Sequence, residues 1–113
     1  MGDMTEAPRL TQWAESLDGT MIAFRARGKG PDLLFARGWI SHLDRVDEDP
    51  AVRAFFGRLE QHFRVIRYDG RGNGLSQREL PDEVMLDHLV QDLAAVADAA
   101  SDGPFHLLSL IHI

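Results

Sequence analysis

Two kinds of hydrophobic pattern alternate along this chain. The apolar run Leu33–Ala36 shows no alternation with polar residues, which is typical of a strand buried on both faces of a parallel sheet. Phe63–Tyr68 is interpreted as another strand. Between them a helix is predicted to begin at Asp49-Pro50, because Asp can cap free backbone amides and Pro suits the first turn. Its apolar residues fall at helical spacing on one face: Val52, Phe55, Phe56 and Leu59.

Further strand and helix patterns lie on both sides of this region. Thr11–Leu17 and Met21–Ala26 are predicted strands joined at Asp18-Gly19, a dipeptide that favours a hairpin turn. A second helix is predicted over Glu83–Ala100, and a last strand begins at Phe105. The helix carries apolar residues on one side: Leu86, Leu89, Val90, Leu93, Val96 and Ala97. Since parallel neighbours need crossover connections, we expect an α/β fold with a mostly parallel sheet, covering helices and an N-terminal antiparallel hairpin.

Composition narrows the possible functions. Of 113 residues, 44% are hydrophobic and 27% charged, which is ordinary for a globular domain. The net charge of −6 comes without a basic stripe, so no nucleic-acid partner is expected. The acidic N-terminus does not resemble a signal peptide and no apolar run reaches membrane-spanning length, so we expect a cytoplasmic protein without a membrane partner.

Neither a metal site nor a cofactor is predicted. The chain has no cysteine, which excludes disulfides and thiolate metal sites. Its histidines show neither the helical pair of a zinc site nor ligand spacing with carboxylates: His42, His62, His88, His106 and His112. The acidic group Asp44, Asp47, Glu48 and Asp49 is interpreted as a solvated helix entry.

Three blocks coincide in order and spacing with the α/β-hydrolase family. They are Leu33–Trp39, then Tyr68–Ser76, then Gly103–Leu107 at the end of the second helix. The chain therefore resembles the N-terminal half of an α/β-hydrolase, of the AB hydrolase-1 type, over about Asp18 to Leu107. The middle block is the most specific, because Asp-x-Arg-Gly-x-Gly-x-Ser directly after a strand is a family hallmark.

The resemblance implies part of an oxyanion hole at Arg37-Gly38-Trp39. The family usually has His-Gly there, followed by a residue whose backbone amide stabilises the developing oxyanion. Here Arg37 replaces the His, Gly38 matches, and Trp39 would supply the amide. The alternative is a strand-ending turn with an aromatic lid over the core.

The glycine-rich block is interpreted as structural rather than catalytic. Gly74-Leu75-Ser76-Gln77-Arg78 begins like a nucleophile elbow but lacks the second glycine, and the glycine spacing is not that of a dinucleotide fingerprint. The resemblance implies that Asp69 and Arg71 hold a crossover loop by hydrogen bonds, with Gly72 and Gly74 at positive φ and Ser76 at its end.

The last strand of the chain lacks the expected nucleophile. In this fold it should lead into Gly-x-Ser-x-Gly, which is absent, and the family's catalytic His comes after the nucleophile. The codons CTG TCT CTT ATA CAC ATC would encode Leu108–Ile113, and they resemble a transposon end used in sequencing libraries. We therefore expect a lead-in over 1–9, a partial hydrolase domain over 10–107 and a non-native tail over 108–113.

Three hypotheses are compatible with these observations. The first is a parent α/β-hydrolase that cleaves an ester, amide or related bond of a small molecule with a Ser-type nucleophile, the chain by itself being an inactive fragment. The second is a hydrolase-like sensor, because Arg37–Leu43 resembles bacterial regulators fused to cyclase or helix-turn-helix domains. A third, an autonomous small domain, predicts a cooperative melt. A sheet cut at Phe105–Leu108 would expose an apolar edge, so we expect self-association.

Overall fold

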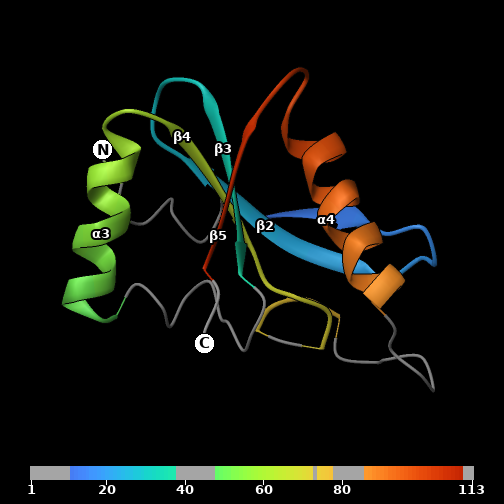
Figure 1. Cartoon of the computed structure of the whole chain (residues 1–113). Helices are drawn as coiled ribbons and strands as arrows, with labels where there is room; N and C mark the ends of the chain where they lie inside the picture. Colours follow the sequence, from blue (N-terminus) through green and yellow to red (C-terminus); the bar gives the residue numbers. More distant parts are fainter. Residues whose placement is uncertain (1–10, 38–47, 73, 78–85, 111–113) are drawn as a thin grey trace.

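A mixed five-stranded sheet forms the centre of the part of the chain that the structure describes. The computed structural model describes residues 11–37, 48–72, 74–77 and 86–110. Its elements, in chain order, are β1 (Gln12–Glu15), β2 (Met21–Arg27), β3 (Asp32–Arg37), α3 (Pro50–Glu60), β4 (Arg64–Tyr68), α4 (Leu86–Ala100) and β5 (His106–Leu110) (Figure 1). The sheet order is β1-β2-β4-β3-β5.

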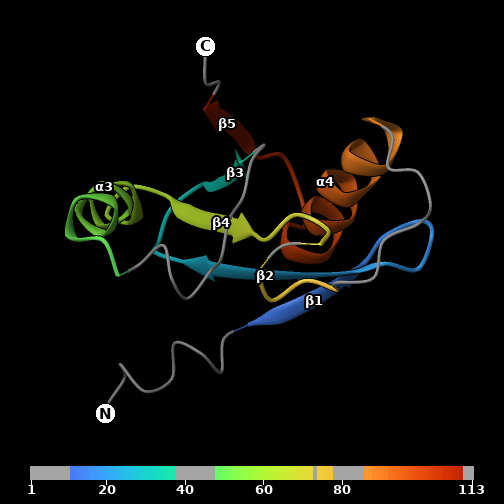
Figure 2. The same ribbon diagram turned by 90° about the horizontal axis from the view of Figure 1, so that it is seen from below.

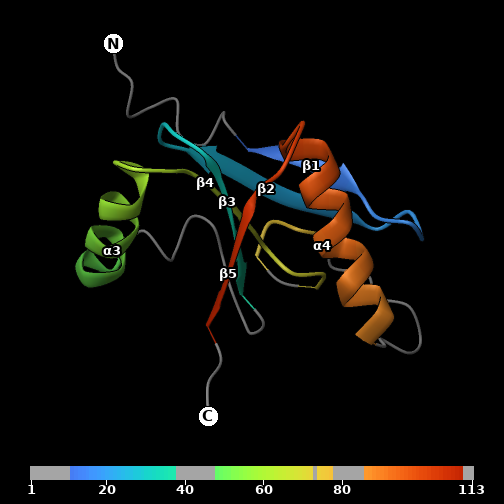
Figure 3. The same cartoon turned by 45° about the horizontal axis from the view of Figure 1, so that its top comes forward.

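The connections explain why the sheet is mixed. A tight turn joins β1 to β2, which pair antiparallel, and β2 also pairs antiparallel with β4. Helices α3 and α4 form crossovers, so β4 and β5 both run parallel to β3, one on each side of it. The two helices lie on opposite faces of the sheet, as Figure 3 shows with the strands between them.

The predicted elements agree with the structure to within a few residues where it describes them. Helix α3 begins at Pro50, and the Asp49 carboxylate accepts a hydrogen bond from the Ala51 amide at 2.9 Å. The last strand begins at His106, one residue after the expected Phe105. The predicted start of the second helix at Glu83 and the lead-in over 1–9 lie outside the described residues.

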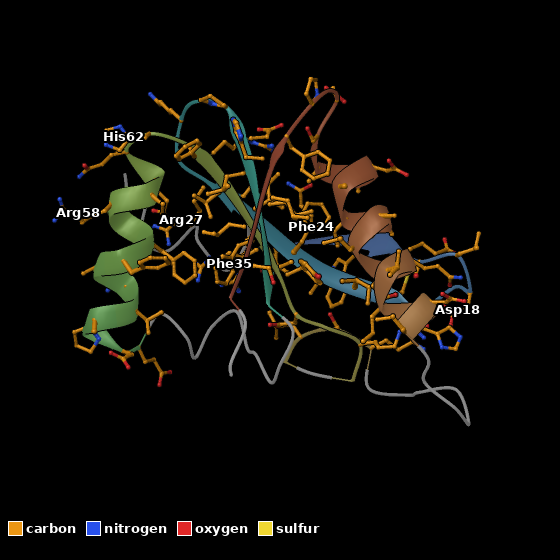
Figure 4. The ribbon with its side chains drawn as sticks, viewed as in Figure 1. Asp18, Phe24, Arg27, Phe35, Arg58 and His62 are labelled. Carbon is orange, nitrogen blue, oxygen red and sulfur yellow. The ribbon has the colours of Figure 1, made fainter. Side chains whose placement is uncertain are left out.

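The core consists of two clusters, one on each face of the sheet. Alternate residues of the strands point to opposite faces, which divides Leu34 from Phe35. Figure 4 shows Phe24 on the α4 side and Phe35 on the α3 side. On the α4 side, buried apolar residues pack together: Ala14, Ile22, Phe24, Leu34, Ile66, Val96 and Ala97. On the α3 side the cluster is Leu33, Phe35, Phe56 and Val65, with Phe35 and Phe56 in edge contact at 5.1 Å.

The turn between β2 and β3 passes very close to the turn between α3 and β4. Gly30 has φ +130°, and a Cβ added there would lie 2.3 Å from the His62 carbonyl oxygen. Gly28 has φ +101°, and its Cβ would lie 2.3 Å from the Phe63 carbonyl oxygen. Glycine is therefore required at both positions by conformation and by space.

The described helices are α3, with 11 residues, and α4, with 15. Within that part of the chain, neither is long and apolar enough to cross a membrane.

Candidate functional site

The carboxyl ends of the parallel strands define the candidate site. In open α/β sheets, ligands bind in the crevice outside these ends. Strand β3 ends at Arg37 and β5 ends at Leu110, and the register pairs these two residues. The chain therefore leaves both strands side by side, at the start of the predicted oxyanion loop. Gly38 and Trp39 themselves lie outside the described residues.

The glycine loop, which we define as Asp69–Ser76 without Asn73, follows β4 at this same edge. Its Asp69 is fully buried, and one carboxylate oxygen accepts a hydrogen bond from the Leu75 amide at 2.8 Å. The Ser76 hydroxyl donates to the Asp69 carbonyl and accepts from the Ala23 amide at 2.9 Å. The Asp69 amide in turn donates to the Ala23 carbonyl at 3.0 Å. Both ends of the loop are thus fixed to one point on β2.

Two glycines give the loop its tight course. Gly72 and Gly74 have φ of +79° and +50°, a region in which a side chain is strained. A Cβ on Gly74 would lie 2.1 Å from the nearer Asp69 carboxylate oxygen, because that carboxylate fills the inside of the loop. Ser76, the last residue of the loop, is buried, and its hydroxyl both donates and accepts a hydrogen bond, a geometry that does not present it to a substrate.

Arg71 holds the loop to two other parts of the chain. Its guanidinium donates to both Asp92 carboxylate oxygens, at 2.8 and 2.7 Å, and this carboxylate comes from the inner face of α4. It also donates to both oxygens of Asp18, at 2.9 and 3.3 Å, in the hairpin turn between β1 and β2. Figure 4 places Asp18 beside α4. We call this group the arginine clamp: Asp18, Arg71 and Asp92.

The clamp is buried on one side and open to solvent on the other. The side chains of Arg71 and Asp92 are 1% and 2% exposed, whereas that of Asp18 is 30% exposed. The hydrogen bond to Arg71 holds the pKa of Asp18 well below its usual range. The Asp92 carboxylate likewise raises the pKa of the Arg71 guanidinium above its usual value. The Asp18 carboxylate and the Arg71 guanidinium are therefore both charged at neutral pH.

The Asp92 charge also acts on Tyr68, at the end of β4. Burial, together with that charge, raises the pKa of the Tyr68 phenol to about 12.

The remaining titratable residues do not form a site in the part that the structure describes. His106 is exposed against the Phe63 ring, and His62 is exposed after α3. No group of three metal-ligating side chains occurs among the described residues. His42, Asp44, Asp47 and His112 lie outside that part of the chain.

Sequence reasoning missed both partners of Arg71. A signal for Asp92 was present, because an acid four residues before Val96 interrupts the apolar face of α4, and a charge at such a position needs a buried partner. Nothing local to the Asp18-Gly19 turn points to a partner 53 residues away.

Comparison with solved structures identifies the fold of the chain. A hydrolase from Sphaerobacter thermophilus superposes with a TM-score of 0.67 at 35% identity, over 87% of this chain and 35% of that protein. The chain has an α/β-hydrolase fold. An esterase from Rhodococcus gives a TM-score of 0.63 at 30% identity, over 80% of this chain and 32% of its own length.

Sequence comparison points the same way over a shorter stretch. RutD of Caulobacter vibrioides, which is named as a carbamate hydrolase, is 40% identical over 50 residues, 44% of this chain and 19% of that protein. No protein-family model matches the chain. The chain thus spans about a fifth of this curated relative and about a third of the α/β-hydrolase structures.

Proposed function

We propose that this chain is the N-terminal part of an α/β-hydrolase that cleaves an ester, amide or related bond of a small molecule. The observation that carries the proposal is the register of β3 with β5, which pairs Arg37 with Leu110. In this fold the nucleophile follows the strand at the position of β5, and an oxyanion-hole amide comes from the loop after the strand at the position of β3. The pairing of Arg37 with Leu110 therefore means that β3 and β5 end next to each other.

The role proposed for each residue follows from this placement. The backbone amide of Trp39 donates a hydrogen bond to the oxyanion, and Gly38 lets the chain turn after Arg37. The nucleophile is a serine in the remainder of the parent, where the acid and the His also lie. The similarity to a hydrolase, an esterase and a protein named as a carbamate hydrolase supports acyl transfer as the reaction class.

The glycine loop has a supporting role in this proposal. Asp69 and Ser76 fix the loop to β2, and Arg71 fixes it to α4 and to the hairpin turn. This loop leaves β4 at the same edge of the sheet at which β3 and β5 end. None of its side chains takes part in bond cleavage.

The chain alone is expected to be inactive, since a hydrolase without its nucleophile and general base retains little catalysis. Purified chain is assayed with short p-nitrophenyl esters, next to a Ser76→Ala variant. The expected result is the buffer rate for both. Turnover by the chain that Ser76→Ala abolishes would contradict both the inactive state and the structural role of Ser76.

A chimera tests the active side of the proposal. Residues 11–107 replace the matching third of the Sphaerobacter hydrolase, so that the nucleophile, acid and His come from that protein. Esterase activity is expected, and Trp39→Pro is expected to lower kcat by roughly a hundredfold, because proline removes the donating amide. Trp39→Ala keeps the amide and serves as the matched control. Equal activity of the two variants would refute the oxyanion role.

A further inference from the structure

Three Asp-Gly dipeptides occur in the sequence, and the structure places them in three different environments. They are Asp18-Gly19, Asp69-Gly70 and Asp102-Gly103. An aspartate followed by glycine is prone to isomerise, because glycine has no Cβ to keep its amide nitrogen away from the neighbouring side-chain carboxyl carbon. The reaction proceeds most readily from a protonated carboxyl group on a side chain that rotates freely, next to an amide without a hydrogen bond. The fold decides which of the three dipeptides meets these conditions.

The isomerisation needs no reactant other than water. The glycine amide nitrogen attacks the side-chain carboxyl carbon of the aspartate, a C–N bond forms, and the carboxyl hydroxyl leaves with the amide proton as water. Water then opens the resulting succinimide ring at one of its two carbonyls. Opening at the main-chain carbonyl gives isoaspartate, in which the backbone runs through the side-chain methylene, and opening at the other carbonyl restores aspartate. The mass of the chain is unchanged, and nothing is oxidised or reduced.

Both reacting groups of Asp18-Gly19 are held by hydrogen bonds. The Gly19 amide donates to the Ser16 carbonyl at 2.9 Å, inside the hairpin turn. The Asp18 carboxylate accepts from the Thr20 amide at 3.1 Å, and it accepts from the Arg71 guanidinium at 2.9 and 3.3 Å. The hydrogen bond to Arg71 also holds the pKa of this carboxyl well below its usual range, so the group stays in its less reactive anionic form. Ring closure here therefore requires that the turn and the arginine clamp open first.

Burial protects Asp69-Gly70 in a different way. Asp69 is fully buried, and its carboxylate accepts a hydrogen bond from the Leu75 amide at 2.8 Å. The same carboxylate fills the inside of the glycine loop, where it leaves no room for a Cβ on Gly74. The Asp69 side chain therefore cannot rotate toward the Gly70 amide unless the packed loop opens.

Asp102-Gly103 meets the conditions that the other two dipeptides do not. Both residues are exposed in the connection from α4 to β5, which Figure 2 shows between these two elements. Within the part of the chain that the structure describes, neither the Asp102 carboxylate nor the Gly103 amide has a hydrogen-bond partner. The preceding residue is fixed, because the Ser101 amide donates to the Ala97 carbonyl at 2.9 Å and its hydroxyl donates to the Asp32 carboxylate at 2.6 Å. The unheld dipeptide thus follows directly after an anchored residue.

We propose that Asp102-Gly103 is a modification site, at which the folded chain spontaneously converts aspartate to isoaspartate, whereas the fold protects Asp18-Gly19 and Asp69-Gly70. The site lies before the amino end of β5, and the candidate site lies at the carboxyl ends of the strands, so the proposal does not rest on the proposed hydrolase function. Isoaspartate adds one backbone atom to the connection that leads into the pairing of His106 with Leu33. Chemical ageing of the folded chain therefore begins at the connection that places β5 beside β3.

Long incubation of the whole chain in mildly acidic buffer, made with water enriched in heavy oxygen, tests the proposal. Each ring opening adds one heavy oxygen atom, and tryptic peptides separate the three dipeptides because arginines lie between them. Fragmentation of the peptides by electron transfer distinguishes isoaspartate from aspartate. In the folded chain we expect isoaspartate to form at Asp102 roughly tenfold faster, or more, than at Asp18 or Asp69. Equal rates at the three sites, or a faster rate at Asp18 or Asp69, would overturn the proposal.

Two controls separate the effect of the fold from that of the local sequence. In guanidinium chloride the three dipeptides should isomerise at similar rates, because neither the arginine clamp nor the packed glycine loop persists there. Gly103→Ala is the control within the folded chain: its Cβ would meet no atom within 4 Å, so the fold is kept, but the methyl group shields the amide and should slow the reaction at Asp102 roughly tenfold. An unchanged rate in this variant would overturn the proposal. So would a ratio of rates that stays the same in denaturant, or isomerisation of Asp102 only in the unfolded chain.

Discussion

Neutralising Asp92 should destabilise the chain strongly, because this carboxylate is the buried half of the arginine clamp. The Asp92→Asn change keeps the size of the side chain but removes its charge and one of its two acceptor atoms. The Arg71 guanidinium, 1% exposed and held by two hydrogen bonds of 2.8 and 2.7 Å, loses its only fully buried counter-charge within the clamp.

The magnitude follows from the cost of an uncompensated buried charge. Removing one partner of a buried ion pair typically costs about 3–5 kcal/mol. Asp18 keeps its two contacts with the guanidinium, so we expect the lower end, about 3 kcal/mol. Because small domains have only about 5–15 kcal/mol of stability in total, this loss is a large share.

Urea unfolding followed by circular dichroism measures the effect. For a small protein the slope is about 1–3 kcal/mol per molar urea, so Asp92→Asn should lower the midpoint by roughly 1–3 M. Asp98→Asn is the matched control, since Asp98 is exposed on the same helix. The double change Arg71→Met with Asp92→Leu replaces the pair by apolar side chains and should cost less than Asp92→Asn alone. Equal midpoints for Asp92→Asn and Asp98→Asn would refute this reasoning.

Three further predictions follow from the same structure. Tyr68 is the chain's single tyrosine and its pKa is raised to about 12, so near-ultraviolet absorbance of the folded chain should show no tyrosinate near pH 10. The folded state keeps the phenol protonated, so the stability that Tyr68 contributes is present below the unfolded pKa of about 10 and is lost as the pH rises toward 12. Gly30→Ala should destabilise the folded chain by roughly 2 kcal/mol or more, because Gly30 has a positive φ and the added Cβ would clash with the His62 carbonyl oxygen. Gly57→Ala, in open space within α3, should stabilise the folded chain by about 0.5–1 kcal/mol. Equal melting temperatures of the two variants would contradict both expectations. The pKa of Asp18 is lowered from its ordinary 3.8 by the hydrogen bond to Arg71, so this contact stabilises the folded chain above that pH and the stabilisation is lost as the pH falls below it. Asp18→Asn should therefore flatten this part of the acid unfolding curve. An unchanged curve would contradict the prediction.

The elements themselves could be predicted from the sequence, because their signals are local. The apolar run Leu33–Ala36 marks a buried strand, Asp49-Pro50 marks the start of α3, and Asp18-Gly19 marks the hairpin turn. Each signal depends on the period or on the backbone preferences of a few neighbouring residues. The hydrolase resemblance likewise depended on short blocks at fixed spacing, and the comparisons confirmed the fold that it implied.

Only the tertiary structure determines which strands pair and which side chains come into contact. The hydrophobic periodicity of the sequence does not predict that β2 pairs antiparallel with β4, or that β5 pairs with β3, because strand order depends on packing between distant segments. For the same reason, the sequence marked Arg71 as a loop anchor but not its two carboxylates, which lie 21 and 53 residues away. Only burial of the α4 face against the sheet brings Asp92 to the guanidinium, and only the β1–β2 turn brings Asp18 there.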